Sequence, residues 1–224
     1  MVDSYLHEKE VDKWEVTDKI LCRVIRGGRL SSRKSIAVPG LELHMPTLTE
    51  DDNKNIKDAA KYGVTGVMLP FVRNRDDLVN LKEALLNVGL DDVKIYAKIE
   101  NMDGVNKLPS LIEACDEIVI ARGDLGNAVG LVNLPAIEED IARTCREHNR
   151  AFMVVTEMLA SMIHKAVPTR AEVMDIYSAV RLGASSVMLT GETATGDYPK
   201  EAMDVLVSTS KSALLKEEQG YGHF

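Results

Sequence analysis

EIVIARGDLG (residues 117–126) is an apolar run that ends in a charged cluster enclosed by glycines. A short run rich in Ile and Val is typical of a strand that is buried on both faces of a parallel sheet. A turn after such a strand needs one glycine, yet Arg122 and Asp124 flank Gly123, and Gly126 follows. We interpret Asp124 as a functional side chain at the end of a strand. The glycines are interpreted as positions where the backbone approaches a ligand closely. Arg122 is expected to orient the loop and not to touch a substrate.

Four similar apolar runs precede or follow this one, and helical patterns lie between them. Strands alternating with helices predict an α/β fold built from βα units on a parallel sheet. Thr49 and Asp52 form a capping box before the first helical pattern, which stops at Gly63. The expected strands are residues 63–71, 93–100, 117–124, 151–158 and 185–192, and the expected helices are 53–63, 75–89, 134–148, 168–183 and 198–218.

The first part of the chain has a different pattern. Residues 18–40 read as two strands around a Gly-Gly and Ser-Ser turn, which predicts a β hairpin and not a βα unit. The polar, glycine-containing end predicts a flexible tail. We therefore expect an N-terminal segment at 1–45, a βα domain at 46–217 and a tail at 218–224.

Composition narrows the class of protein. The chain has 224 residues, 45% of them hydrophobic, which suffices for one α/β domain. Its net charge of -8, without a basic stripe, argues against nucleic acid and anionic membranes as partners. No apolar run approaches the ~20 residues that span a bilayer, and the charged start lacks a signal peptide's apolar region. Three cysteines without a CxxC motif indicate a reducing compartment, so a cytoplasmic location is expected.

Polar residues follow the last four predicted strands, where a buried core would not need them. In parallel α/β folds the carboxyl ends of the strands form the functional site. Lys98 and Glu100 are two positions apart on a strand and so share a face. Glu100 and Asp124, on successive strands, can converge, and paired carboxylates with open positions suit Mg²⁺ or Mn²⁺. Lys98 would supply a point charge where negative charge develops in a reaction. The polar residues at the ends of the four strands are Lys98, Glu100, Asp124, Thr156, Thr190 and Glu192.

Each of these residues has a structural alternative. Asp124 precedes a possible helical turn and could cap it, while Lys98 and Glu100 could form a structural ion pair. Thr156 and Thr190 taken singly are typical strand-end hydroxyls. The placement of all of them at consecutive strand ends favours a site, whereas the five histidines have no metal-ligand spacing and receive no role.

Several of these stretches together resemble the pyruvate kinase family. The motifs occur in the family's order and spacing, although Glu157 stands where the family usually has Gln, and the resemblance covers about residues 14–215. They are AKIEN (97–101), ARGDLG (121–126), TEMLASMI (156–163), PTRAE (168–172) and MLTGETATGDYP (188–199).

The resemblance implies a role for each matching residue. Glu100 and Asp124 would be the Mg²⁺ ligands, and Lys98 would stabilise the transferred phosphoryl group and the enolate. The backbone at Gly123 and Asp124 would hold the substrate carboxylate. Thr156 would lie at the enolate face that receives the proton, and Thr190 and Glu192 would belong to the water network behind it. The substrates implied are phosphoenolpyruvate and pyruvate.

The resemblance also implies a fold, a partial TIM (β/α)₈-type barrel with five βα units preceded by a short β hairpin. The family's first three barrel strands lie outside the match, together with its phosphate and K⁺ ligands and most of its ADP side. K⁺, ADP and ATP are therefore not expected as ligands of this stretch alone. Five parallel strands leave open edges, so we expect a homo-oligomer or a complementing chain.

Two functions remain open from the sequence. One is a pyruvate kinase-like phosphotransferase, which could be limited to enolate chemistry such as pyruvate enolisation or oxaloacetate decarboxylation. The other is a non-catalytic binding module or partner subunit. Retention of Lys98, Glu100, Asp124 and Thr156 together favours the enzyme, because a remnant without catalysis would be expected to lose some of them.

Overall fold

The computed structural model describes residues 23, 27 and 45–218. The chain divides into two units, residues 1–44 and 45–224, and the second contains all the helices and strands described below. The predicted hairpin at 18–40 and most of the predicted tail lie outside the described residues.

The described unit is built on one parallel sheet of five strands in the order β1-β2-β3-β4-β5. Each strand pairs in parallel with its neighbours along the chain, for example Lys98 with Val119 and Ala121 with Val155. This confirms the predicted α/β fold of consecutive βα units. The strands are β1 Gly66–Leu69, β2 Lys94–Ile99, β3 Glu117–Ala121, β4 Ala151–Val155 and β5 Ser186–Met188.

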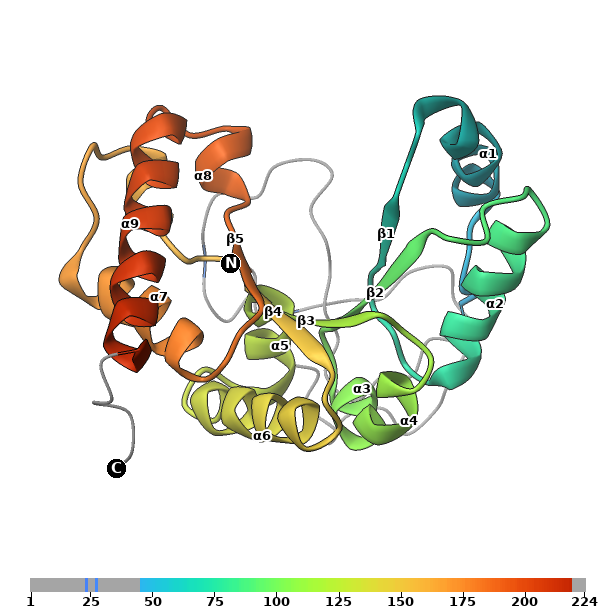
Figure 1. Cartoon of the computed structure of the whole chain (residues 1–224), viewed down its shortest axis with the longest axis horizontal. Helices are drawn as coiled ribbons and strands as arrows, with labels where there is room; N and C mark the ends of the chain where they lie inside the picture. The colour runs from blue at the N-terminus through green and yellow to red at the C-terminus, as the bar shows by residue number, and fades with distance from the viewer. Residues whose placement is uncertain (1–22, 24–26, 28–44, 219–224) are drawn as a thin grey trace. The chain divides into compact units, whose positions relative to one another are not determined.

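The sheet is curved, and the helices lie along its outer side (Figure 1). Thr49 caps the first helix with the predicted capping box, in which its side chain and that of Asp52 each accept a backbone N–H. Gly63, Gly89 and Gly183 follow helices with positive φ, as expected of stop signals. The helices are α1 Glu50–Ala59, η1 Ala60–Tyr62, α2 Arg75–Leu86, α3 Met102–Asn106, α4 Leu108–Ile112, α5 Arg122–Val129, α6 Leu134–Glu147, η2 Ala160–Ile163, α7 Arg170–Arg181, α8 Gly191–Ala194 and α9 Pro199–Glu218.

The main hydrophobic core lies between the sheet and the helices. On β2, alternate residues Ile95, Ala97 and Ile99 are buried in this core. Tyr96, one position out of phase, packs in a second, smaller cluster with Val119 and other residues of β3 to β5. Lys98 has the same strand parity as Tyr96 and so lies on the inner face of the sheet.

Three of the predicted strand ends are wrong by three or more residues, because β3, β4 and β5 end at Ala121, Val155 and Met188. Asp124 therefore lies in the first turn of α5 and not on β3. Glu192 lies in α8 and not on β5. After β3 and β5 the chain turns into a short helix because contacts from other elements, described below, hold the residues that follow the strand.

The short helices α3 and α4 were not expected from the sequence. Asn101 caps α3, since its side-chain oxygen accepts the N–H of Gly104 at 2.8 Å, and Pro109 lies in the first turn of α4. An Asn cap and a Pro in a first turn are the signals that could have revealed them. No helix among the described residues is both long and apolar enough to cross a membrane.

Candidate active site

Lys98 and Glu100 meet at the carboxyl end of β2. The Nζ atom of Lys98 lies 2.6 Å from Oε1 of Glu100, whose side chain is only 1% exposed. The other carboxylate oxygen, Oε2, accepts the backbone N–H of Phe71 at 2.7 Å, just beyond the end of β1. Glu100 is therefore buried with its charge compensated by an ammonium and a backbone donor, as a buried carboxylate requires.

Gly123 and Thr156 connect the ends of β3 and β4. The N–H of Gly123 donates to Oγ1 of Thr156 at 2.8 Å, and the same hydroxyl donates to the carbonyl of Val155 at 2.6 Å. Thr156 and Glu157 both have positive φ, 73° and 55°. Such a conformation in two successive non-glycine residues is strained and persists only where surrounding contacts hold it. The hydroxyl of Thr156 thus has a defined position at the strand ends.

Arg122 supplies much of that support. Its guanidinium is 10% exposed, donates to both carboxylate oxygens of Asp175 at 2.6 and 2.7 Å, and donates to the carbonyl of Thr156 at 3.1 Å. Burial alone would lower the pKa of Arg122, but Asp175 outweighs it and the pKa lies above its usual value. Glu138 of α6 lies 3.8 Å away, and burial raises the pKa of this carboxyl despite the nearby guanidinium. Arg122 therefore orients this loop, as expected from the sequence.

Asp124 lies at the N-terminal end of α5. It is exposed, and no described side chain forms a hydrogen bond or ion pair with it. Among the described residues no side chain caps this helix end, so N–H groups of its first turn could bind an anion, apart from that of Gly123, which donates to Oγ1 of Thr156. At Gly126, by contrast, a Cβ atom would come within 3.2 Å of Leu131, so this glycine permits packing and not the approach of a ligand.

Glu100 and Asp124 are the residues that could hold a divalent cation here, with other oxygens completing its coordination. Glu100 and Asp124 offer hard carboxylate oxygens, which Mg²⁺ and Mn²⁺ prefer. The described residues contain no cluster of three or more His, Cys, Asp or Glu side chains that could hold a metal ion by themselves. Of these two carboxylates, that of Asp124 is exposed and that of Glu100 is buried.

Glu192 ties the loops after β4 and β5 together. Its side chain is buried, and its two oxygens accept the N–H groups of Leu159 and Thr190, both at 2.9 Å. Thr190 is partly exposed beside it. Both oxygens are therefore engaged with the backbone, and Glu192 shapes the loop that carries Thr190.

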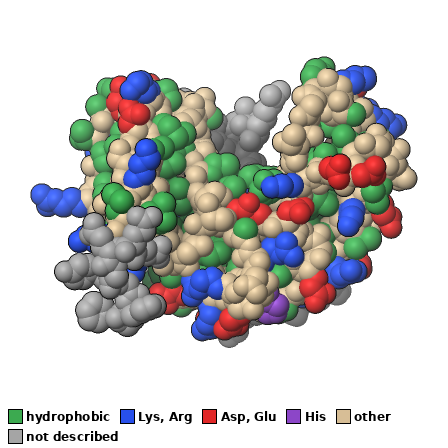
Figure 2. Space-filling view, viewed as in Figure 1, with side chains coloured by type: hydrophobic (Ala, Val, Ile, Leu, Met, Phe, Trp, Pro, Cys, Tyr) green, Lys and Arg blue, Asp and Glu red, His purple; other side chains and the backbone are tan. Residues whose placement is uncertain are grey.

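The structure thus brings the predicted residues together as contacting groups: Lys98 with Glu100, Gly123 with Thr156, and Thr190 with Glu192. It shows no hydrogen bond or ion pair between the Asp124 carboxylate and another described side chain. Acidic and basic side chains gather in the middle of the face in view, over the region of β2 and β3 (Figure 2). Phe71 and Asp175 were missed, because their contacts join residues far apart in the chain and leave no local pattern.

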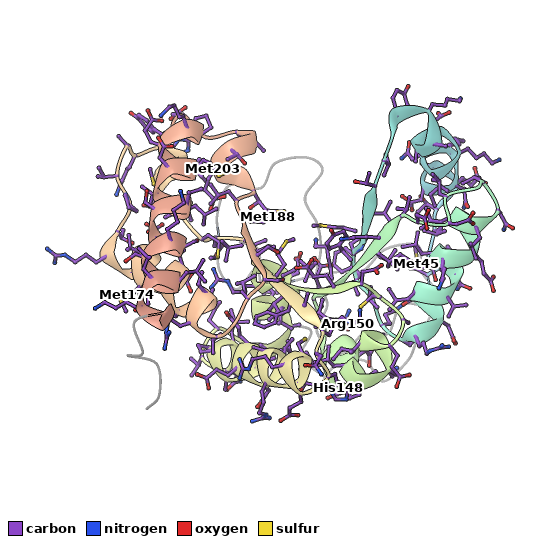
Figure 3. All side chains as sticks on the ribbon, viewed as in Figure 1. Met45, His148, Arg150, Met174, Met188 and Met203 are labelled. Carbon is purple, nitrogen blue, oxygen red and sulfur yellow. The ribbon has the colours of Figure 1, made fainter. Side chains whose placement is uncertain are left out.

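The described residues also form two surface hollows that none of the predicted site residues line. One, of about 440 Å³, lies between α1 and α2. The other, of about 410 Å³, lies along β5 and α9 and is lined largely by apolar residues such as Leu206 and Leu214. Met188 of β5 and Met203 of α9, labelled in Figure 3, both line the second hollow. This second hollow runs beside an edge strand of the sheet.

Consecutive βα units, with ammonium, carboxylate and hydroxyl groups at the strand ends, define a partial (β/α)-barrel protein with a strand-end site. Comparison with known proteins makes the assignment specific. Residues 2–203 match the model of the pyruvate kinase barrel domain, and the chain belongs to the pyruvate kinase family.

Individual relatives agree with this assignment. The chain is 34% identical to the pyruvate kinase of Clostridium perfringens (strain 13 / Type A), over 99% of this chain and 46% of that protein. It is 37% identical to the pyruvate kinase of Borreliella burgdorferi, over 92% of this chain and 45% of that protein. It is also 40% identical to the chloroplastic plastidial pyruvate kinase 3 of Arabidopsis thaliana, over 87% of this chain and 34% of that protein. The chain spans about half the length, or less, of these relatives.

Proposed function

We propose that these residues form a pyruvate kinase-type site that acts on phosphoenolpyruvate and pyruvate with Mg²⁺ or Mn²⁺. The observation that carries the proposal is the 2.6 Å contact between the Lys98 ammonium and the buried Glu100. A lysine held at a strand end by a buried carboxylate is a fixed positive charge beside a candidate metal ligand. Such a charge suits a reaction in which a substrate oxygen becomes negative.

The proposed roles are those that the resemblance to pyruvate kinases implies for each group. Lys98 would stabilise the oxygen of an enolate, and the Thr156 hydroxyl, held by Gly123 and Val155, would face the carbon that loses or gains a proton. The N-terminal turn of α5 would bind the substrate carboxylate through its backbone N–H groups. Glu100 and Asp124 would hold the divalent cation, which when bound would polarise the substrate's oxygens.

Enolate chemistry is the part of the reaction that these residues support best. Stabilising an enolate oxygen needs only positioned charges, and such stabilisation is often the largest catalytic contribution. Phosphoryl transfer needs a nucleotide aligned with the phosphoryl group as well, and alignment accounts for much of that catalysis. We therefore propose that a polypeptide of these 224 residues enolises pyruvate or decarboxylates oxaloacetate. Transfer from phosphoenolpyruvate to ADP would be feeble without further chain.

We also propose a cytoplasmic, reducing setting. Cys115 and Cys145 are free and buried. Burial raises the pKa of Cys115 to about 11 and that of Cys145 to about 12, so both are protonated thiols at neutral pH. Protonated, buried thiols are inert packing groups.

The test is exchange of the methyl protons of pyruvate with deuterated solvent, followed by NMR with and without Mg²⁺. We expect Mg²⁺-dependent exchange that Lys98→Met abolishes while the circular dichroism spectrum stays unchanged. Lys94→Met is the matched control, because Lys94 lies at the other end of the same strand and is exposed. It should exchange at the wild-type rate.

Three outcomes would overturn part of the proposal. Proton exchange that persists in Lys98→Met would show that Lys98 is not needed for the reaction. Binding of pyruvate without any exchange would favour the non-catalytic binding module. Robust ATP formation from phosphoenolpyruvate and ADP by the purified polypeptide would overturn the restriction to enolate chemistry.

A further inference from the structure

We infer that Asp175, on α7, is a positioning residue for Thr156 and acts through the guanidinium of Arg122. The proposed function assigns no role to Asp175. The inference rests on the proposed role of Thr156 at the reacting carbon. By this inference α7, a helix on the outer side of the sheet, helps to hold the Thr156 hydroxyl in position.

The first link is the pair between Asp175 and Arg122. Two parallel hydrogen bonds, of 2.6 and 2.7 Å, join the two carboxylate oxygens to the two terminal nitrogens of the guanidinium. A bidentate pair fixes the plane as well as the position of the guanidinium. Asp175 has a side chain 36% exposed, whereas that of Arg122 is 10% exposed, so the pair joins the outer helix to the interior.

The second link joins Arg122 to Thr156. The Nη2 atom that donates to Oδ2 of Asp175 also donates to the carbonyl of Thr156 at 3.1 Å. The residue after Arg122, Gly123, donates its N–H to the hydroxyl of the same threonine. Thr156 is thus held from the ARGD segment at two points, one on its backbone and one on its side chain.

The strain at Thr156 explains why such support is needed. Its φ of 73° and that of Glu157, 55°, are unfavourable for non-glycine residues. Without the hydrogen bond to its carbonyl, the peptide after Thr156 is free to rotate toward an unstrained conformation. The hydroxyl would then leave the position between Gly123 and Val155.

The third link is the fixed position of α7 itself. Its N-terminus is closed by a capping box, and Glu172 in that box also accepts the N–H and the hydroxyl of Ser161 in η2. Ile176, the next residue after Asp175, is fully buried in the main core. Asp175 is therefore carried by an element that is anchored on both sides of it.

The experiment compares Asp175→Asn with wild type and with Asp140→Asn as a matched control. Asp140 also forms a 2.6 Å pair with an arginine, Arg143, but on the exposed surface of α6. Asparagine keeps the shape of the side chain but loses its charge and one of the two acceptor oxygens. If Asp175→Asn does not fold, Arg122→Lys takes its place, since lysine keeps the charge but lacks the planar fork that donates to both oxygens of Asp175.

Two readouts separate positioning from a general loss of stability. The first is the ¹³C-methyl NMR resonance of Thr156, assigned with Thr156→Val, which needs no activity. It should shift in Asp175→Asn and stay in place in Asp140→Asn. The second is pyruvate proton exchange, where kcat should fall about tenfold or more while KM and Mn²⁺ affinity stay within about twofold.

A double-mutant cycle completes the test. In a Thr156→Ala background, Asp175→Asn should cost no further activity, because its effect passes through Thr156. A Thr156 methyl resonance that is the same in wild type and Asp175→Asn would overturn the inference. If the wild-type chain shows no exchange at all, the proposed function has failed, and the NMR resonance alone still decides the positioning role.

Discussion

The backbone N–H of Phe71 donates to Oε2 of Glu100 at 2.7 Å, although the two residues lie 29 positions apart. Phe71 has a φ of 52°, and the residue is 55% exposed to solvent. A phenylalanine in this conformation is strained, and burial of its ring does not compensate. The contact with Glu100 is thus a reason for the chain to adopt the strained conformation just beyond β1.

Phe71→Gly and Phe71→Ala form a matched pair that separates the backbone from the ring. Both remove the ring, but only alanine keeps the cost of a positive φ, so the glycine variant should unfold at the higher urea concentration. We expect a difference of up to about 1 kcal/mol in the free energy of unfolding. An alanine variant as stable as the glycine variant would show that the strain at position 71 is not real.

Removing either proposed ligand should weaken binding of Mn²⁺. Calorimetric titration of the wild-type chain should show one site, and Asp124→Asn should reduce its affinity at least about tenfold, or about 1.4 kcal/mol. Asp124 is the cleaner test because no described side chain pairs with it, whereas Glu100→Gln also leaves Lys98 without its carboxylate. Unchanged Mn²⁺ affinity in both variants would rule out this metal site, and Asp140→Asn serves as the control.

Acid should remove the contribution of Glu172 to stability. Burial by itself would raise the pKa of this carboxyl, but hydrogen bonds from Ser161 and Thr169 outweigh it and the pKa lies below its usual value. A depressed pKa means that the contribution is present above the unfolded-state value of about 4.3 and is lost as the pH falls through the folded-state value. At pH 7, the free energy of unfolding measured in urea should be higher for wild type than for Glu172→Gln by about 1–2 kcal/mol.

The difference between wild type and Glu172→Gln should then shrink between about pH 5 and pH 3. Glu147→Gln is the control, since Glu147 is an exposed carboxylate on α6. A difference that is constant over this pH range would contradict the assignment of the stabilisation to the charged form.

Self-association is expected from the edges of the sheet. Within the described residues β1 and β5 each pair on one side only, and the apolar hollow beside β5 includes Leu206 and Leu214. Edge strands with unpaired backbone groups favour pairing with another chain, and we expect a second copy of this one. Sedimentation at micromolar concentration should give a mass above the 24.7 kDa monomer. A stable monomer would count against this, and Leu206→Glu should weaken any association.

Local periodicity was enough to predict the α/β fold and part of the site. Strand alternation placed Lys98 and Glu100 on one face, and the structure joins them at 2.6 Å. The capping box of Thr49 and the helix stop at Gly63 depend only on neighbouring residues, and both were predicted correctly.

Long-range contacts account for what the sequence could not reveal. β3 was expected to continue to Asp124, but the chain turns into α5 at Arg122, whose guanidinium bonds Asp175 and Thr156 at separations of 53 and 34 positions. The contact of Phe71 with Glu100 is of the same kind. No pattern within a window of ten or twenty residues records such pairs, so the path of the chain beyond a strand end depends on partners that become visible only in the folded structure.

The order of the strands in the sheet has a consequence for how the chain acquires its structure during synthesis. Each strand is hydrogen-bonded to the one made just before it, in the sequence β1-β2-β3-β4-β5. A chain emerging from the ribosome folds its N-terminal parts first. Among the described strands, each one after β1 therefore meets the edge of the strand translated just before it. The sheet can grow one βα unit at a time, at the pace of translation.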